Sequence, residues 1–167
     1  MYRMTVAGLC LIAACVPAPR QAGFRDRSVP ISSSTAFDPA RFQGQWQVVG
    51  AFGDAARCGV LDEDWRIGTA AFVITGMRCG PQGGTGYRTV ARLSGPGRVS
   101  RDGPGGAEEI WILWVDADYR VAAFGTPDGG FGGILARPGQ ARADLLTAAR
   151  EILDFNGYDI SRLQFLR

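Results

Sequence analysis

Short strand-like runs separated by glycine-rich turns fill this 167-residue chain from Phe37 to Arg137. The sequence holds 24 glycines, and clusters such as 127–130 separate runs that are apolar or alternate in polarity. Tight turns between segments of period two are typical of antiparallel sheets. The expected strands are 45–52, 69–77, 87–93, a weak segment at 98–101, 109–115, 119–125 and 131–137.

The hydrophobic period changes after Pro138 and Gly139. Apolar residues recur at helical spacing from Ala141 to Leu153, with arginines and acids on the other side, and Asn156-Gly157 is a C-cap signal. This pattern predicts an amphipathic helix over about 140–156, followed by a final strand over 158–166. We therefore expect residues 37–167 to form one all-β domain with one α-helix, an antiparallel up-and-down barrel with the helix packed outside.

The composition excludes several classes of function. The chain has no histidine, and all 18 basic residues are arginine, so the commonest general base, the commonest metal ligand and Schiff-base lysines are absent. The net charge is only +2 and the arginines are spread along the chain, which argues against a nucleic-acid partner. We expect no catalytic residue, no metal and no cofactor.

Two carboxylate pairs remain as candidates for acid–base chemistry. Glu108 and Glu109 are adjacent on an expected strand, so their side chains should point to opposite faces and cannot converge on one substrate. Asp116 and Asp118 lie at a strand end, where roles in a turn are expected. Neither pair predicts an enzyme.

Residues 1–15 have the layout of a secretory signal peptide. One arginine precedes an uncharged apolar run, which is too short to span a membrane. The end of this run, Ile12-Ala13-Ala14-Cys15, resembles the lipobox of bacterial lipoproteins; Cys10 fits less well because the run before it would be too short. The resemblance implies that Cys15 carries the lipid (a diacylglyceryl group and palmitate), and that the protein is anchored in the bacterial envelope. The alternative is ordinary secretion with Cys15 incidental.

The residue after Cys15 indicates the membrane that holds the protein, and the segment that follows indicates how the barrel is linked to it. Val16 favours the outer membrane, by resemblance to enterobacterial sorting, with the protein facing the periplasm or the surface. Residues 16–36 are rich in proline, arginine and serine and show no period, which predicts a flexible tether.

Cleavage before Cys15 would leave Cys58 and Cys79 as the candidates for pairing. An exported protein meets an oxidising compartment, so a disulfide between them is the natural inference. Two free thiols are the alternative.

Four segments resemble the lipocalin family, and more closely its branch of bacterial outer-membrane lipoproteins and apolipoprotein D. They are Gly44-x-Trp46 within an opening that begins at Phe37, an acidic-Tyr motif at 115–119, an Arg-ended strand at 134–137, and the tail 157–163. The similarity covers 37–53 and 109–167, whereas 54–108 matches poorly. In that region we expect about two strands where lipocalins have three, so either a hairpin is shortened or the barrel is partly open.

The resemblance implies a barrel closed at one end by Trp46, with Gly44 beside it and Arg137 across the indole face. A cation–π contact of this kind stabilises by about 1–2 kcal/mol when it is desolvated. These residues are therefore expected to be structural.

The resemblance also implies binding and storage or transport of a small apolar ligand, such as a lipid, a lysophospholipid or a fatty acid. Strand parity from Trp46 and Arg137 places Gly50 and Gly133 inside, where they would leave space. The candidate lining residues are Val48, Phe52, Phe72, Tyr87, Trp114, Phe124, Phe131 and Leu135. A core filled by these side chains is the alternative.

A second hypothesis is a membrane-tethered interaction or inhibitor module with a filled barrel. Its best candidate surface is the acidic stretch 61–65, expected as a loop with Trp65 as an aromatic anchor. The sequence leaves the ligand, the partner and the oligomeric state open.

Overall fold

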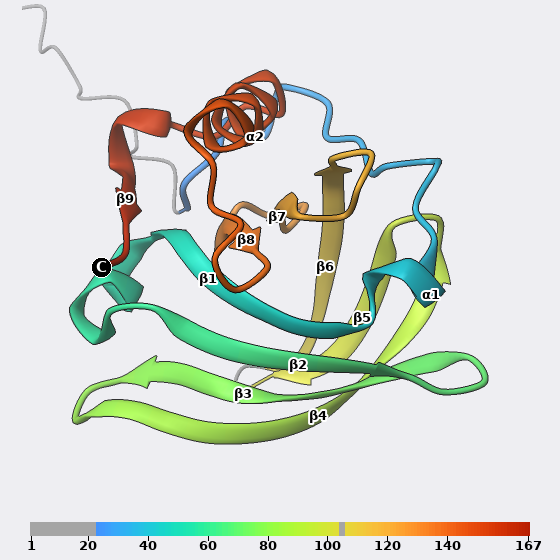
Figure 1. Cartoon of the computed structure of the whole chain (residues 1–167). Helices are drawn as coiled ribbons and strands as arrows, with labels where there is room; N and C mark the ends of the chain where they lie inside the picture. Colours follow the sequence, from blue (N-terminus) through green and yellow to red (C-terminus); the bar gives the residue numbers. More distant parts are fainter. Residues whose placement is uncertain (1–22, 104–105) are drawn as a thin grey trace, which may run out of the picture.

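The computed structural model describes residues 23–103 and 106–167, and it shows a closed barrel of eight antiparallel strands (Figure 1). Each strand pairs with the next, and β1 pairs with both β2 and β8, which closes the sheet. The predicted fold class is confirmed. The barrel strands are β1 (Gly44–Phe52), β2 (Leu61–Ile67), β3 (Ala71–Gly80), β4 (Gly83–Gly95), β5 (Arg98–Gly103), β6 (Gly106–Val115), β7 (Val121–Gly125) and β8 (Gly132–Ala136).

Helix α2 (Ala143–Phe155) packs outside the barrel against β6, β7 and β8, and buries Ala149 and Leu153. The other helical pieces are short: α1 (Pro39–Phe42), η1 (Gly53–Cys58) and η2 (Ile160–Arg162). The final strand expected over 158–166 is only β9 (Leu163–Phe165), because the Asp159 side chain caps η2 first. No helix within residues 23–103 and 106–167 has the length and apolar character needed to cross a membrane.

Strand β2 corrects the expectation of a loop at 61–65. Leu61 and Trp65 are buried in the interior, whereas Asp62 and Arg66 are exposed, so the stretch alternates with period two despite its acidic residues. The sequence assignment missed this strand because three acids in four residues resemble a loop. The barrel is therefore complete, and the surface proposed for an interaction module is a barrel wall.

The register of neighbouring described strands shifts at three places, between Leu93 and Gly95 where β4 pairs with β5 and at two β-bulges that change which predicted residues face inside. The register shifts between Val48 and Gly50 where β1 pairs with β8, and between Ile112 and Trp114 where β6 pairs with β7. An extra residue in a strand moves all later side chains to the opposite face. The interior core therefore takes Val48 and Ala51, while Phe52 faces the outer layer under α2.

Residues 23–36 correct the predicted extent of the tether. The Phe24 amide donates to the Gly129 carbonyl (2.7 Å), and the Ser34 amide donates to the Ile112 carbonyl (2.8 Å). Arg25 is only 5% exposed, and its Nε donates to the carbonyl of Asn156 (3.1 Å). These hydrogen bonds hold the segment against the barrel and α2. The predicted signal sequence and Cys15 lie outside the described residues.

Candidate functional site: the open end of the barrel

One end of the barrel is filled by aromatic side chains. Helix α1 places Phe42 under the barrel, where its ring lies 4.6 Å from that of Trp46 and 5.2 Å from that of Trp65. Phe72 from β3 packs edge-on against Trp65, and all four side chains are essentially inaccessible to solvent. This end, which we call the closed end, leaves no room for a ligand among these rings.

Arg137 seals the closed end from outside. Its guanidinium carbon lies 3.9 Å from the centroid of the Trp46 ring, so the predicted contact is present. The guanidinium also donates to the carbonyls of Gln45 (3.0 Å), Arg41 (3.0 Å) and Tyr119 (3.2 Å). Gly44 has a positive φ of 105°, a conformation that favours glycine, and a Cβ there would also lie 3.0 Å from Arg137 Nη1. Every polar partner is backbone, as expected for a structural plug.

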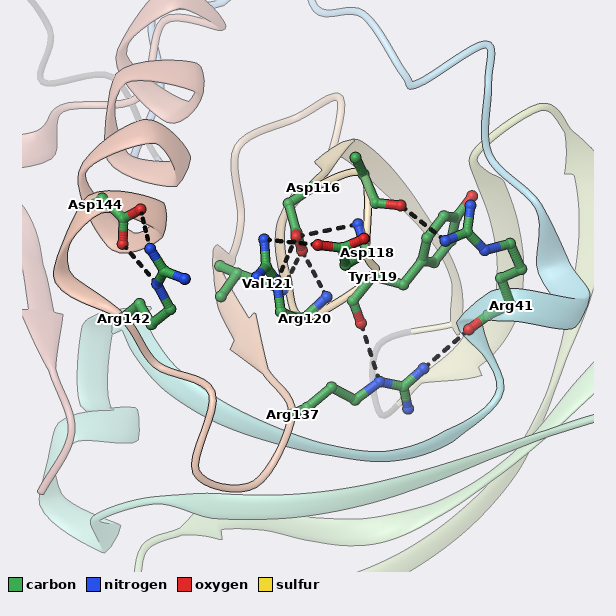
Figure 2. Close-up of polar contacts among 10 residues, drawn as sticks. Arg41, Asp116, Asp118, Tyr119, Arg120, Val121, Arg137, Arg142 and Asp144 are labelled. Atoms are coloured by element: carbon green, nitrogen blue, oxygen red, sulfur yellow. Dashed lines mark hydrogen bonds and ion pairs between the residues drawn. The ribbon is translucent and has the colours of Figure 1, made fainter.

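Asp116 fixes the turn between β6 and β7 at the same end (Figure 2). Its buried carboxylate accepts hydrogen bonds from the Val121 amide (2.7 Å), the Asp118 amide (3.2 Å) and Arg120 Nε (2.9 Å). Burial works to raise the pKa of Asp116, but the hydrogen bonds outweigh it and hold the pKa below its ordinary value. The turn role expected from the sequence is thus present, and it carries no catalytic geometry.

The opposite end of the barrel, which we call the open end, holds a pocket of about 400 Å³. Its apolar side chains come mainly from β1, β7 and the β7–β8 loop, and its charged side chains come from β2 to β6; β2 and β3 each contribute one of both kinds. The apolar residues include Val48, Ala51, Leu61, Met77, Phe124 and Phe131; the charged ones are Glu63, Arg78, Arg88, Arg101, Asp102 and Glu108. Ligand pockets typically combine a largely apolar wall with a few convergent polar groups.

A chain of polar contacts lines the charged wall. The Tyr87 hydroxyl donates to Glu63 Oε1 (2.5 Å), and Trp65 Nε1 donates to Glu63 Oε2 (2.9 Å). Arg101 Nε donates to Glu108 Oε2 (3.1 Å). Burial and the neighbouring Glu63 carboxylate raise the pKa of Tyr87 above its ordinary value, so its phenol stays protonated and keeps donating.

Arg101 joins the two walls of the pocket. Its guanidinium carbon lies 5.7 Å from the ring centroids of both Tyr87 and Phe131. The side chain therefore presents a cation between an aromatic ring of each wall. Sequence reasoning missed this residue because 98–101 was expected only as a weak strand. Its shared parity with buried Val99 was the available signal.

The Glu63 and Glu108 carboxylates are engaged with donors. Glu109 lies on the outer side, where its carboxylate accepts from Trp111 Nε1 (3.1 Å), so Glu108 and Glu109 diverge as expected. Within the part of the chain that the structure describes, no three potential metal ligands lie together.

Five of the eight predicted lining residues contribute to the pocket lining. Val48, Tyr87, Phe124 and Phe131 line the pocket. Phe52 reaches the pocket wall, but its ring stacks outside the barrel on Phe24 (5.5 Å) and Tyr158 (5.1 Å). The bulge between Val48 and Gly50 in β1 turns the Phe52 ring to the outside of the barrel.

The remaining predicted lining residues do not reach the pocket. Phe72 belongs to the closed end, and Leu135 is buried in the interior core away from the pocket. Trp114 packs in the outer layer because the bulge at Ile112–Trp114 turns it outward.

Gly50 and Gly133 do not create the cavity, contrary to expectation. A Cβ at Gly133 would collide with the carbonyl oxygen of Gly50, and a Cβ at Gly50 would face Ile134 in the outer layer. These glycines let β1 and β8 approach closely at the bulge. The pocket lies beyond them, toward the loops.

The predicted disulfide between Cys58 and Cys79 is present, with 5.5 Å between the two Cα atoms. It ties η1 to the end of β3, and Cys79 contributes to the pocket wall. The disulfide thus fixes one side of the open end.

Comparison with known proteins shows the fold. No family model matches the chain, and no curated protein sequence matches it. Among solved structures it resembles apocrustacyanin C2 and apocrustacyanin C1 (TM-score 0.61 for each) and lobster apocrustacyanin A1 (TM-score 0.62). Each is 15% identical in sequence, and the matches cover 83% of this chain and 89% of the other. Crustacyanins are lipocalins, so the barrel is of lipocalin type.

Proposed function

We propose that this protein binds a small amphipathic ligand in the pocket at the open end. The observation that carries the proposal is that one pocket combines apolar side chains, mainly from β1, β7 and the β7–β8 loop, with charged side chains from β2 to β6. A hydrocarbon chain fits beside Val48, Ala51 and Phe124, and a polar group fits beside Tyr87 and Arg101. The lipocalin-type fold supports a role in storage or transport, because the crustacyanins it resembles are lipocalins.

The charges narrow the ligand class. A purely apolar molecule would exclude water from the Arg101–Glu108 ion pair without forming hydrogen bonds to it, and this desolvation costs free energy. A fatty acid or a lysophospholipid can offer an anionic group to Arg101 or Arg78 at the rim while its chain covers the apolar wall. We therefore favour ligands with one hydrocarbon chain and one anionic group.

We further propose that the protein is anchored by a lipid on Cys15 in the bacterial envelope, at the outer membrane. The support is the signal-like pattern of residues 1–15 and the small residues before Cys15. The disulfide is compatible with an oxidising compartment. Binding rather than catalysis is proposed as the activity, since Glu63 is engaged with Tyr87 and Trp65, and Glu108 with Arg101.

Titration with a long-chain fatty acid, the matching alcohol and a lysophospholipid tests this function, read by tryptophan fluorescence and by native mass spectrometry. We expect saturable one-to-one binding that is tightest for the two anionic ligands. Ala51→Phe should abolish it, because Ala51 is buried in the pocket wall. Ala40→Phe, at an exposed site on α1, is the matched control and should bind normally. A folded wild-type protein that binds none of the three would overturn the proposal.

A further inference from the structure

Exposed apolar side chains gather at the open end. Five large hydrophobic residues are exposed in the part of the chain that the structure describes, and four of them lie on elements of this end. Phe155, at the end of α2, is 75% exposed, and Phe165, on β9, is 47% exposed. Val60 and Met77 complete the set, whereas Val90 lies on the flank of β4.

These four residues come from four segments that reach the open end: the η1–β2 connection, β3, the end of α2 and β9. Val60 lies between η1 and β2, and Met77 lies on β3 within the pocket lining. Phe155 is the last residue of α2, and Phe165 is the last residue of β9, which follows α2 and η2 (Figure 1) and pairs with the final residues of β1. Exposed phenylalanine side chains are among those that enter the interface of a bilayer.

The described chain also begins at the open end. The Phe24 amide donates to the Gly129 carbonyl, and Gly23 packs against the same β7–β8 loop. Only residues 16–22 separate Cys15 from Gly23. A chain of seven residues can reach at most roughly 25 Å. A lipid on Cys15 would therefore hold the open end, and not the closed end, beside the membrane.

We infer that the open end docks on the surface of a phospholipid bilayer, with Val60, Met77, Phe155 and Phe165 at the lipid interface. Charges of both signs surround the rim: Arg78 and Arg88 are exposed, and so are Asp102 and Asp128. The contact should therefore be mainly apolar and should tolerate zwitterionic lipid and moderate salt. Docking in this orientation would let a ligand with a hydrocarbon chain pass between the bilayer and the pocket without crossing water.

The orientation is tested on the full chain by hydrogen–deuterium exchange, with and without phosphatidylcholine vesicles. Docking predicts that amides in 57–60, 80–83 and 155–159 exchange about tenfold more slowly on vesicles. Amides in 68–70, 117–119 and 138–141, at the closed end, should not change. Protection at the closed end, or vesicle binding without protection at either end, would overturn the inference.

Two variants test whether the protection from exchange depends on the exposed apolar residues at the open end. Phe155→Ser combined with Phe165→Ser should remove the protection at the open end, whereas Val90→Ser, which changes a similarly exposed residue on the flank, should keep it. Equal protection in both variants would contradict the inference, and so would protection that needs a membrane protein in the vesicles.

The inference rests on the proposed lipid anchor for its geometry, but its failure is separable from failure of the proposed function. Neither Phe155 nor Phe165 lines the pocket, so the double variant should bind fatty acid in solution as tightly as the wild type. The mass of the purified chain reports independently whether Cys15 is acylated.

Discussion

The two ends of the barrel use the same kinds of residue for opposite purposes. At the closed end Arg137 lies on Trp46, and its donors meet backbone carbonyls. At the open end Arg101 lies near Tyr87 and Phe131, but its ion-pair partner is the side chain of Glu108 beside a pocket. Backbone carbonyls cannot leave Arg137, so its contacts only stabilise the closed end. The Glu108 side chain can move, so Arg101 can exchange this partner for an anionic group of a ligand.

The largest expected effect is at the closed end. Trp46→Ala should lower the free energy of unfolding by about 3–5 kcal/mol, because it leaves a cavity between Phe42 and Arg137. Urea unfolding of both proteins measures the loss. The protein that remains folded should bind fatty acid as before, since Trp46 does not line the pocket. A loss under about 1 kcal/mol would contradict the assignment of Trp46 as the plug.

Loss of the disulfide should lower both the stability of the protein and its affinity for a ligand. Replacing Cys58 and Cys79 together by serine opens a loop with a sequence separation of 21. The chain-entropy model then predicts a loss of about 3 kcal/mol. Because Cys79 lines the pocket, ligand affinity should fall as well. Unfolding and titration of the variant, with reduced wild type as reference, check both effects; unchanged affinity would show that the pocket does not depend on η1.

The next effect is the pH dependence of stability that Asp116 gives to the closed end. The pKa of Asp116 is lowered in the folded protein, so its contribution is fully present above the ordinary pKa of 3.8 and is lost as the pH falls below that value. Asp116→Asn should remove about 1–2 kcal/mol near neutral pH and should flatten the loss of stability in acid. Unfolding curves measured between neutral pH and pH 3 test this. An equally steep acid loss in the variant would show that other carboxylates dominate.

The smallest effect on stability is expected at the open end. Arg101→Met should change the free energy of unfolding by less than about 1 kcal/mol, because its ion pair is partly exposed. Fatty-acid affinity should nevertheless fall about tenfold, while affinity for the matching alcohol changes little. Arg66→Met is the matched control, since the ion pair of Arg66 with Asp64 lies outside the barrel. Equal losses for acid and alcohol would refute a charge-specific role.

The features read correctly from the sequence are those that depend on local periodicity and on residue type. Alternation and turns predicted most strands, the 3.6-residue period predicted α2, and the inference of an oxidising compartment predicted the Cys58–Cys79 disulfide. The contact of Trp46 with Arg137 followed from the family resemblance, and Val48 was placed correctly by parity because no register shift lies between Trp46 and Val48.

The missed features depend on register and on contacts between distant segments. Phe52 and Trp114 were placed inside because parity was counted through bulges that only strand pairing reveals. Residues 23–36 show no period, since their hydrogen bonds go to Gly129, Asn156 and Ile112 far along the chain. The Arg101–Glu108 pair joins neighbouring strands, and its position in the pocket needed the register of β5 on β6.

The most direct test of the central claim is solution NMR of the protein titrated with a fatty acid. The account predicts chemical-shift changes at the open end, centred on Thr89, Arg101 and Phe131, with none at Trp46 or Asp116. Shift changes centred on the closed end, or no changes at saturating fatty acid, would contradict the account.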